Sequence, residues 1–351
     1  MIGIALLTLV PGELGGSETA TRGLLRGLAD VGTLEYRAYV PPVAPDAGEG
    51  LPTEVVPEYR RAHSIPERLL AMTLAAAHPG PLRRHLEPAD VVHYPLTIAL
   101  PSARVPTVVT LYDVQHLDLP EMFPRAERAF RTLAYDRSAR SAARVVVSSE
   151  FVRDRAVERL RLDGERIRVI PFGIDHERFR PDGEHREPFL LYPARVWPHK
   201  NHERLFHAFG LLRRVRPDLR LVLTGGGSRE RVAFPRGVEV HGQVSPEALV
   251  SLYRRASALV FPSLYEGFGQ PPLEAMACGC PVVCSNAASL PEVCGDAARY
   301  FDPHDTDEMA DAVLEVLTDP EPWRERGFAR AAQFTWERTA CAHEDVYREL
   351  L

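Results

Sequence analysis

The segment SLYEGFGQPPLEAMACGCP, residues 263–281, is the part of the chain that indicates the fold. It follows an apolar run at residues 258–261 and precedes another at residues 282–284, and short runs of this kind are typical of buried parallel strands. Pro271 and Pro272 suit the first turn of a helix, where a missing N–H removes no hydrogen bond. The segment therefore predicts a strand, a glycine turn, a helix at residues 270–279 and a second strand.

The glycine turn has the features of an anion site. Gly267 and Gly269 lie where the helix begins, and without a Cβ their backbone N–H groups can approach a ligand that the helix dipole attracts. Glu266 and Glu274, with seven residues between them, bracket the turn. Amide donors beside two carboxylate acceptors suit a sugar nucleotide. The alternative interpretation is that Glu274 only complements the helix dipole and that Glu266 is solvated.

The surrounding sequence extends this pattern. EGFGQPPLEAMACGCPVV, followed by SNAASLPEVCGDAARYFDP from Ser285, resembles the signature of the retaining glycosyltransferases of family 4. The resemblance implies the α/β fold called GT-B, with two Rossmann-like domains facing each other across a cleft. It also implies a GDP- or UDP-linked sugar as the donor substrate, no cofactor and no required metal.

The same resemblance suggests roles for the turn residues. Glu274 is expected to bind ribose hydroxyls and Glu266 to lie near the sugar. The N–H groups of Gly267, Phe268 and Gly269 are expected to reach the sugar hydroxyls and the phosphate.

Length and composition set broad limits. The chain has 351 residues, which at ~150 residues per domain favours two domains. The net charge of −6 argues against binding nucleic acid through a general electrostatic field. We find no apolar run of about 18 residues and no charged start of a signal peptide, so we expect a cytoplasmic protein, with peripheral contact at the inner face of the membrane left open. The five cysteines are odd in number and mostly clustered, which argues against a disulfide framework, and they lack the spacing of a metal site.

Strand and helix signals alternate along both halves of the chain. Strands are expected at residues 2–7, 34–40, 90–93, 107–111, 143–147, 167–170, 189–193, 219–224 and 238–242, in addition to the two above. Helices are expected at residues 17–30, 150–160 and 202–215, at 60–86 with breaks at Pro66 and Pro79, and as three helices after residue 305. Ser17 and Ser149 are expected N-caps.

These elements suggest a domain division. We place the first domain at residues 1–180 and the second, nucleotide-sugar-binding domain at residues 181–335. By the family resemblance, residues 336–351 form a helix that crosses back to the first domain.

The second half offers two cations after its first strand. Arg195 and Lys200 flank the loop that follows residues 189–193. Ligands of open parallel sheets bind beyond the carboxyl ends of the strands, although isolated surface cations are commonly just solvated. The resemblance assigns this pair to the donor diphosphate. Gly225, in a run of three glycines, and Gly242, expected from relatives to lie near the base, end two further strands at the same edge.

The first half contains a glycine loop at residues 8–16. Gly12, Gly15 and Gly16 do not have the GxGxxG spacing of a dinucleotide site, which disfavours an oxidoreductase. A tight strand-to-helix turn is one interpretation. The other rests on the resemblance, in which Gly15 and Gly16 match a glycine pair that faces the donor phosphate and the acceptor.

The catalytic candidates of the first half depart from the family pattern. Relatives often carry a histidine directly before Asp113, near the anomeric carbon, and this chain has Tyr112 there. Tyrosine can donate a hydrogen bond but is a poorer proton shuttle near neutral pH. His116 matches the histidine of a subset of relatives and either contacts the reacting sugar or is structural. Asp113 either orients a side chain or caps the turn.

We therefore predict transfer of a mannose- or glucose-type hexose from a nucleotide diphosphate sugar to a hydroxyl of a glycan, lipid-linked or small-molecule acceptor. Arg195, Lys200 and the helix N-terminus can neutralise the leaving diphosphate, which makes a metal unnecessary. No side chain is an obvious nucleophile, so we favour front-face attack with the leaving phosphate taking the proton. The alternatives are a sugar-nucleotide epimerase of the same fold and a non-catalytic sugar-nucleotide sensor.

Overall fold

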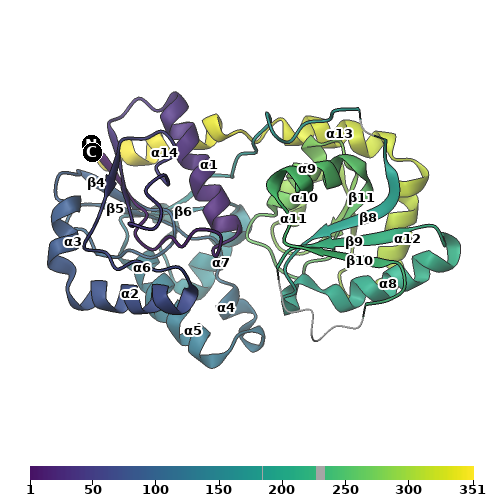
Figure 1. The fold of residues 1–351 in the computed structure, drawn as a ribbon, viewed down its shortest axis with the longest axis horizontal. Helices are drawn as coiled ribbons and strands as arrows, with labels where there is room; N and C mark the ends of the chain where they lie inside the picture. Colours follow the sequence, from purple (N-terminus) through teal and green to yellow (C-terminus); the bar gives the residue numbers. More distant parts are fainter. Residues whose placement is uncertain (184, 227–233) are drawn as a thin grey trace. The chain divides into compact units, whose positions relative to one another are not determined.

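The computed structural model describes residues 1–183, 185–226 and 234–351, and it divides into two compact units. One unit contains Met1–Gly173 and Thr335–Leu351, and the other contains Ile174–Phe334. Each unit has one parallel sheet with helices packed on it (Figure 1). The predicted α/β class with two Rossmann-like halves is confirmed.

The first unit is built on a seven-stranded parallel sheet in the order β3-β2-β1-β4-β5-β6-β7. Its strands are β1 (Ile2–Ala5), β2 (Tyr36–Val40), β3 (Thr53–Val55), β4 (Val91–Tyr94), β5 (Thr107–Thr110), β6 (Arg144–Val147) and β7 (Ile167–Val169). Neighbouring side chains of a central strand, such as Val108 and Val109, are both fully buried. Such a sheet needs apolar residues on both faces, which explains the valine-rich runs of the sequence.

Helices cover this sheet. Of the two expected N-caps, the one at Ser149 is confirmed and the one at Ser17 is corrected. The helices are α1 (Gly16–Val31), α2 (Ile65–Ala77), α3 (Pro79–Leu86), α4 (Gln115–Asp118), α5 (Arg125–Arg131), α6 (Arg137–Ser141) and α7 (Glu150–Leu160), with a π-helical turn (Thr132–Asp136) between α5 and α6. Ser149 caps α7 by accepting a hydrogen bond from the Val152 N–H, as expected. The cap expected at Ser17 is wrong, because Gly15 occupies that position and Ser17 donates to the Leu14 carbonyl.

The prolines of the 60–86 region begin helices instead of breaking one. Pro66 lies in the first turn of α2 and Pro79 is the first residue of α3. Ser64 caps α2, because its side chain accepts a hydrogen bond from the Glu67 N–H. Proline is tolerated in a first helical turn because its nitrogen needs no hydrogen there.

The second unit has a six-stranded parallel sheet in the order β10-β9-β8-β11-β12-β13. Its strands are β8 (Glu187–Pro193), β9 (Arg220–Thr224), β10 (Val238–Gly242), β11 (Ala256–Phe261), β12 (Val282–Ser285) and β13 (Ala298–Phe301). Its helices are α8 (His202–Val215), α9 (Pro246–Arg255), α10 (Gln270–Ala277), α11 (Leu290–Cys294), α12 (Thr306–Thr318) and α13 (Glu321–Ala331). The predicted limits of α8 and β10 and the start of α10 are confirmed.

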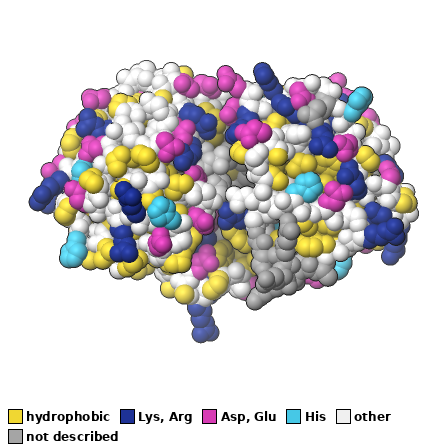
Figure 2. All heavy atoms as spheres, viewed as in Figure 1, with side chains coloured by type: hydrophobic (Ala, Val, Ile, Leu, Met, Phe, Trp, Pro, Cys, Tyr) yellow, Lys and Arg dark blue, Asp and Glu magenta, His cyan; other side chains and the backbone are white. Residues whose placement is uncertain are grey.

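The surface carries charges of both signs. On the face shown in Figure 2, Lys and Arg side chains are interspersed with Asp and Glu side chains on each unit. Within the parts of the chain that the structure describes, no helix has the length and apolar character needed to cross a bilayer.

The last helix, α14 (Trp336–Arg348), belongs to the first unit and packs along α1, which confirms the expected return (Figure 1). Two glycines of α1 make this approach close. A Cβ on Gly23 would lie 2.2 Å from the Trp336 ring, and one on Gly27 would lie 2.6 Å from the Trp336 carbonyl oxygen. Larger residues at these two positions would push the helices apart.

A buried carboxylate fastens α14 to the loop before β2. Glu344 accepts hydrogen bonds from the backbone N–H groups of Thr33 (2.6 Å) and Leu34 (2.9 Å) and from the Tyr36 hydroxyl, and it pairs with Arg348 at 2.9 Å. Burial by itself would raise the pKa of Glu344, but the hydrogen bonds from Tyr36, Leu34 and Thr33 lower it to about 2. The ionised carboxylate therefore stabilises the folded state.

We expect Glu344→Gln to reduce the free energy of unfolding by ~1–3 kcal/mol at neutral pH, because the charged acceptor is lost. The folded pKa lies below the unfolded value, so this stabilisation is present above pH ~4.3 and is lost as the pH falls toward the folded value. Urea unfolding of the wild type and Glu344→Gln across this pH range should therefore show a difference in the free energy of unfolding that becomes smaller as the pH falls.

The matched control is Glu337→Gln, an exposed position on the same helix, where we expect a change within ~0.5 kcal/mol. A loss in Glu344→Gln that does not vary with pH would contradict the role of its charge.

Candidate functional site

The loops after β8, β9 and β11 and the end of β10 meet at the carboxyl edge of the second sheet. This edge is where open parallel sheets bind ligands. Gly225 donates its N–H to the Gly242 carbonyl at 2.7 Å, which joins the ends of β9 and β10. Gly225 has a φ of +114°, and a Cβ there would lie 2.8 Å from the Ala194 carbonyl carbon. Glycine is therefore needed where three strand ends come together. The neighbouring Gly227 lies outside the described residues.

The structure brings Lys200 and Glu266 together as an ion pair. The Lys200 Nζ lies 2.5 Å from the Glu266 Oε1, and the two side chains are only 15% and 14% exposed. The Lys200 carbonyl accepts a hydrogen bond from the Tyr192 hydroxyl at 2.7 Å, and the Leu264 N–H donates to the His199 carbonyl at 2.8 Å. These contacts hold the two loops against each other. The interpretation of Glu266 as a solvated residue is therefore wrong.

The glycine turn before α10 is held from the side by a serine. The Ser289 hydroxyl lies 2.9 Å from the carbonyl oxygens of both Glu266 and Phe268. Gly269 occupies the N-cap of α10 with a φ of +99°, and a Cβ there would lie 2.7 Å from Leu290. Gly267, Phe268 and Gly269 thus form a fixed turn at the N-terminus of α10, as the sequence predicts.

Glu274 faces the interior of the second unit. It is 9% exposed and accepts a hydrogen bond from the Tyr253 hydroxyl at 2.9 Å. Burial raises the pKa of Glu274 to about 7, although the bond from Tyr253 acts in the opposite direction. No acidic residue lies in the first turn of α10, so the interpretation that Glu274 only complements the helix dipole is wrong. Its burial costs stability, as is common for functional carboxylates.

Arg195 lies earlier in the same loop as Lys200. Its guanidinium carbon is 5.8 Å from the centroid of the Trp197 ring, and Trp197 is 50% exposed. Stacking on an aromatic ring restricts the arginine while leaving its donors available to an anion.

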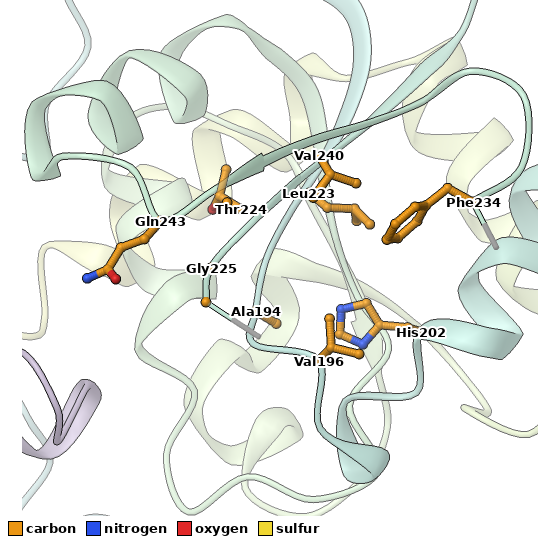
Figure 3. A pocket seen from close by; sticks show the side chains of 11 residues that line it. Ala194, Val196, His202, Leu223, Thr224, Gly225, Phe234, Val240 and Gln243 are labelled. Carbon is orange, nitrogen blue, oxygen red and sulfur yellow. The ribbon is translucent and has the colours of Figure 1, made fainter. Parts of the chain in front are cut away.

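A cavity of about 130 Å³ opens beside these loops (Figure 3). Gly225 and Gly242, which lie at the ends of β9 and β10, line it. Most of its wall is apolar and comes from residues that the sequence did not single out, namely Ala194, Val196, Leu223, Phe234 and Val240. His202 at the start of α8 also lines the cavity. No short-range pattern marks these residues, because they meet only when the strand ends converge.

In the first unit, Tyr112 has partners of its own. Its hydroxyl donates to the Ser17 carbonyl at 3.0 Å and lies 3.2 Å from the Thr21 hydroxyl, and burial raises its pKa well above the usual range. Asp113 accepts a hydrogen bond from the Gln115 N–H at 3.0 Å, which is the turn cap that the sequence suggested. Tyr112 thus connects the end of β5 to α1 and stays protonated at neutral pH.

His116 is buried beside a carboxylate. It is 1% exposed, and its Nε2 lies 3.0 Å from the Asp136 Oδ1 in the π-helical turn. This burial favours the structural interpretation of His116 over direct contact with a sugar. Gly15 and Gly16 lie at the start of α1, where both are exposed to solvent.

Two family models match the chain and together cover most of it. Residues 174–331 match the model for glycosyl transferases group 1, and residues 14–178 match the model for glycosyltransferase family 4. The fold and these matches define the protein as a glycosyltransferase. The chain belongs to the group 1, or family 4, glycosyltransferases.

Curated relatives agree with this assignment, and a solved structure agrees with the fold. O-antigen chain mannosyltransferase B of Escherichia coli is 32% identical over 74% of this chain and 75% of its own length. The serotype-specific mannosyltransferase WbdA of Escherichia coli is 33% identical over 64% of this chain, which spans only 29% of that longer protein. The structure of Anabaena Alr3699/HepE in complex with UDP and glucose superimposes with a TM-score of 0.75 over the full length of both chains, at 18% identity.

We expect Glu274→Gln to stabilise the free protein at about pH 8 by ~1–3 kcal/mol, because it removes a buried carboxylate whose pKa is raised. The unfolded carboxyl ionises near pH ~4.3 and the folded one near 7, so wild-type stability falls as the pH rises between these values. Thermal unfolding should show the gain above neutral pH and almost none at about pH 4.

Glu325→Gln serves as the control, because Glu325 is exposed on α13 of the same unit. Lower stability of Glu274→Gln at both pH values would mean that the carboxylate is structurally required.

Proposed function

We propose that the protein transfers a mannose- or glucose-type hexose from a nucleotide diphosphate sugar to a hydroxyl of a glycan, lipid-linked or small-molecule acceptor. We further propose that it retains the anomeric configuration and needs no metal. The observation that carries the proposal is the Lys200–Glu266 pair beside the glycine turn of α10. The two Escherichia coli mannosyltransferases favour mannose among the hexoses.

The ion pair supplies a means of recognising the donor. When a diphosphate arrives, the Lys200 ammonium pairs with it, and the Glu266 carboxylate is free to accept a sugar hydroxyl. Arg195 and the amides at the start of α10 add positive potential where charge develops on the leaving group. We assign the ribose hydroxyls to Glu274, whose carboxylate then gains donors that offset its burial.

The transfer step balances without a protein nucleophile. The acceptor oxygen bonds to the anomeric carbon as the bond from that carbon to the phosphate oxygen breaks, and the acceptor proton moves to that oxygen. The products are a glycoside and a nucleoside diphosphate. Tyr112 is unsuited to act as the base, because its hydroxyl already donates to Ser17 and its pKa is raised. This supports proton transfer to the leaving phosphate.

We assign the acceptor to the first unit and favour a lipid-linked one at the membrane surface. Leu69, Leu70 and Leu74 of α2 are 40%, 45% and 41% exposed. Exposed leucines on one helix are suited to peripheral contact with lipid.

The first test is a thermal-shift screen of GDP-, UDP-, ADP- and TDP-sugars in the presence of EDTA. We expect one of these sugar nucleotides, at saturation, to raise the melting temperature of the protein by several degrees. Lys200→Ala should lower the affinity for that ligand by at least about tenfold, because a charge-assisted contact to phosphate is lost. The control is Arg214→Ala, which removes an exposed cation from the end of α8.

Activity assays separate the alternatives. Transfer to a glycan acceptor, with the product's anomeric configuration read by NMR, supports the proposal if the configuration is retained. Turnover of the sugar nucleotide without an acceptor indicates an epimerase, and binding without turnover indicates a sensor. A glycosyl adduct trapped on a carboxylate rules out front-face attack.

A further inference from the structure

His202 is a buried polar side chain at the carboxyl edge of the second sheet. It is the first residue of α8 and is 7% exposed. Among the residues that the structure describes, neither Nδ1 nor Nε2 makes a hydrogen bond of good geometry, and the polar group closest to pairing with the ring is the Ala194 backbone. Buried polar groups are nearly always hydrogen-bonded, because an unpaired one loses its hydration without compensation. The free protein therefore keeps two unpaired nitrogens at a site where an apolar residue would be stable.

The imidazole faces the cavity at the carboxyl edge of the second sheet. Figure 3 shows its ring directed into the space below Phe234 and Val240, whereas the Gln243 side chain points away. The ring is held in this position by Tyr192, whose ring centroid lies 4.9 Å away. His202 is thus a fixed polar group inside a cavity with mostly apolar walls.

The ring is neutral at physiological pH. Burial, followed by the nearby charge of Lys200, lowers the pKa of His202 to about 4, although the Ala194 backbone acts in the opposite direction. A neutral imidazole offers one N–H donor and one nitrogen acceptor, and it has no charge with which to attract a phosphate. An apolar slot with such a group suits the polar edge of a flat heteroaromatic ring. The cationic and carboxylate groups that suit a diphosphate and a ribose lie outside the cavity wall.

We infer that His202 selects the nucleobase of the donor by forming a hydrogen bond with the edge of the base. The inference rests on the proposed function, since it assigns the base of the donor to this cavity. A buried group that must be paired discriminates strongly, because a base that leaves it unpaired loses the bond and retains the desolvation cost. The diphosphate is recognised elsewhere, so base choice and phosphate affinity depend on different residues.

The test measures dissociation constants by calorimetry for GDP, UDP, ADP, CDP and inorganic pyrophosphate. The variants are His202→Leu, which removes both nitrogens at similar size, and His202→Asn, which restores one donor and one acceptor. The control is His207→Leu, because His207 is exposed on the same helix. Melting temperatures of the free proteins are recorded alongside.

We expect the wild type to prefer one nucleoside diphosphate by at least about tenfold, the energy of one net hydrogen bond. His202→Leu should reduce this preference about tenfold and leave pyrophosphate affinity unchanged. His202→Asn should recover part of the preference, and His207→Leu should match the wild type. The melting temperature of free His202→Leu should not fall, because its nitrogens had no partners to lose.

Two results overturn the inference alone. One is a wild type that binds nucleoside diphosphates without preference, and the other is His202→Leu with the wild-type preference, whatever its melting temperature. A wild type that binds none of the five probes contradicts the proposed function as well. The two failures are therefore distinguishable from the wild-type titrations.

Discussion

The constraint on which the structure depends is that both parallel sheets are buried on their two faces. Fully buried strand residues such as Val108 in the first unit and Val283 in the second leave no room on either face for a ligand. Polar groups can therefore gather only at the strand ends. The second unit meets this constraint with glycines, since a Cβ on Gly225 would collide with the Ala194 backbone and one on Gly269 would collide with the Leu290 side chain. Gly225 lines the cavity, and Gly269 ends the turn that follows Glu266.

The charges at this edge are arranged so that a ligand can take the place of the protein partner of each charged group. Lys200 and Glu266 neutralise each other in the free protein, so neither is left as an unpaired charge in a partly buried position. Under the proposed function, a diphosphate supplies the counter-charge for the lysine, and sugar hydroxyls supply donors for the carboxylate. The free site thus stays stable without ligand and still offers both signs of charge to the donor.

Local signals predicted the elements, and tertiary contacts decided the roles of single residues. Proline and glycine fix a helix start locally, so the start of α10 at Gln270 and the cap at Ser149 could be predicted. Ser17 failed as a cap because Gly15, with a φ of +58°, ends the turn two residues earlier. The pairing of His116 with Asp136 and the unpaired nitrogens of His202 depend on distant elements, which no spacing in the sequence records.

The polar candidates differ in how far they are satisfied, and in the first unit the buried Nδ1 of His116 has no hydrogen-bond partner among the described residues. In the first unit Tyr112 and Asp113 each have partners within the unit, so binding a substrate through them would break existing hydrogen bonds. In the second unit Glu274 has a raised pKa and His202 has unpaired nitrogens, so a ligand with suitable groups removes a cost that the free protein carries. A binding site gains affinity from such costs, because only the complex relieves them. Under the proposed function, these costs assign most of the donor affinity to the second unit, and we propose that the first unit recognises the acceptor through groups other than Tyr112.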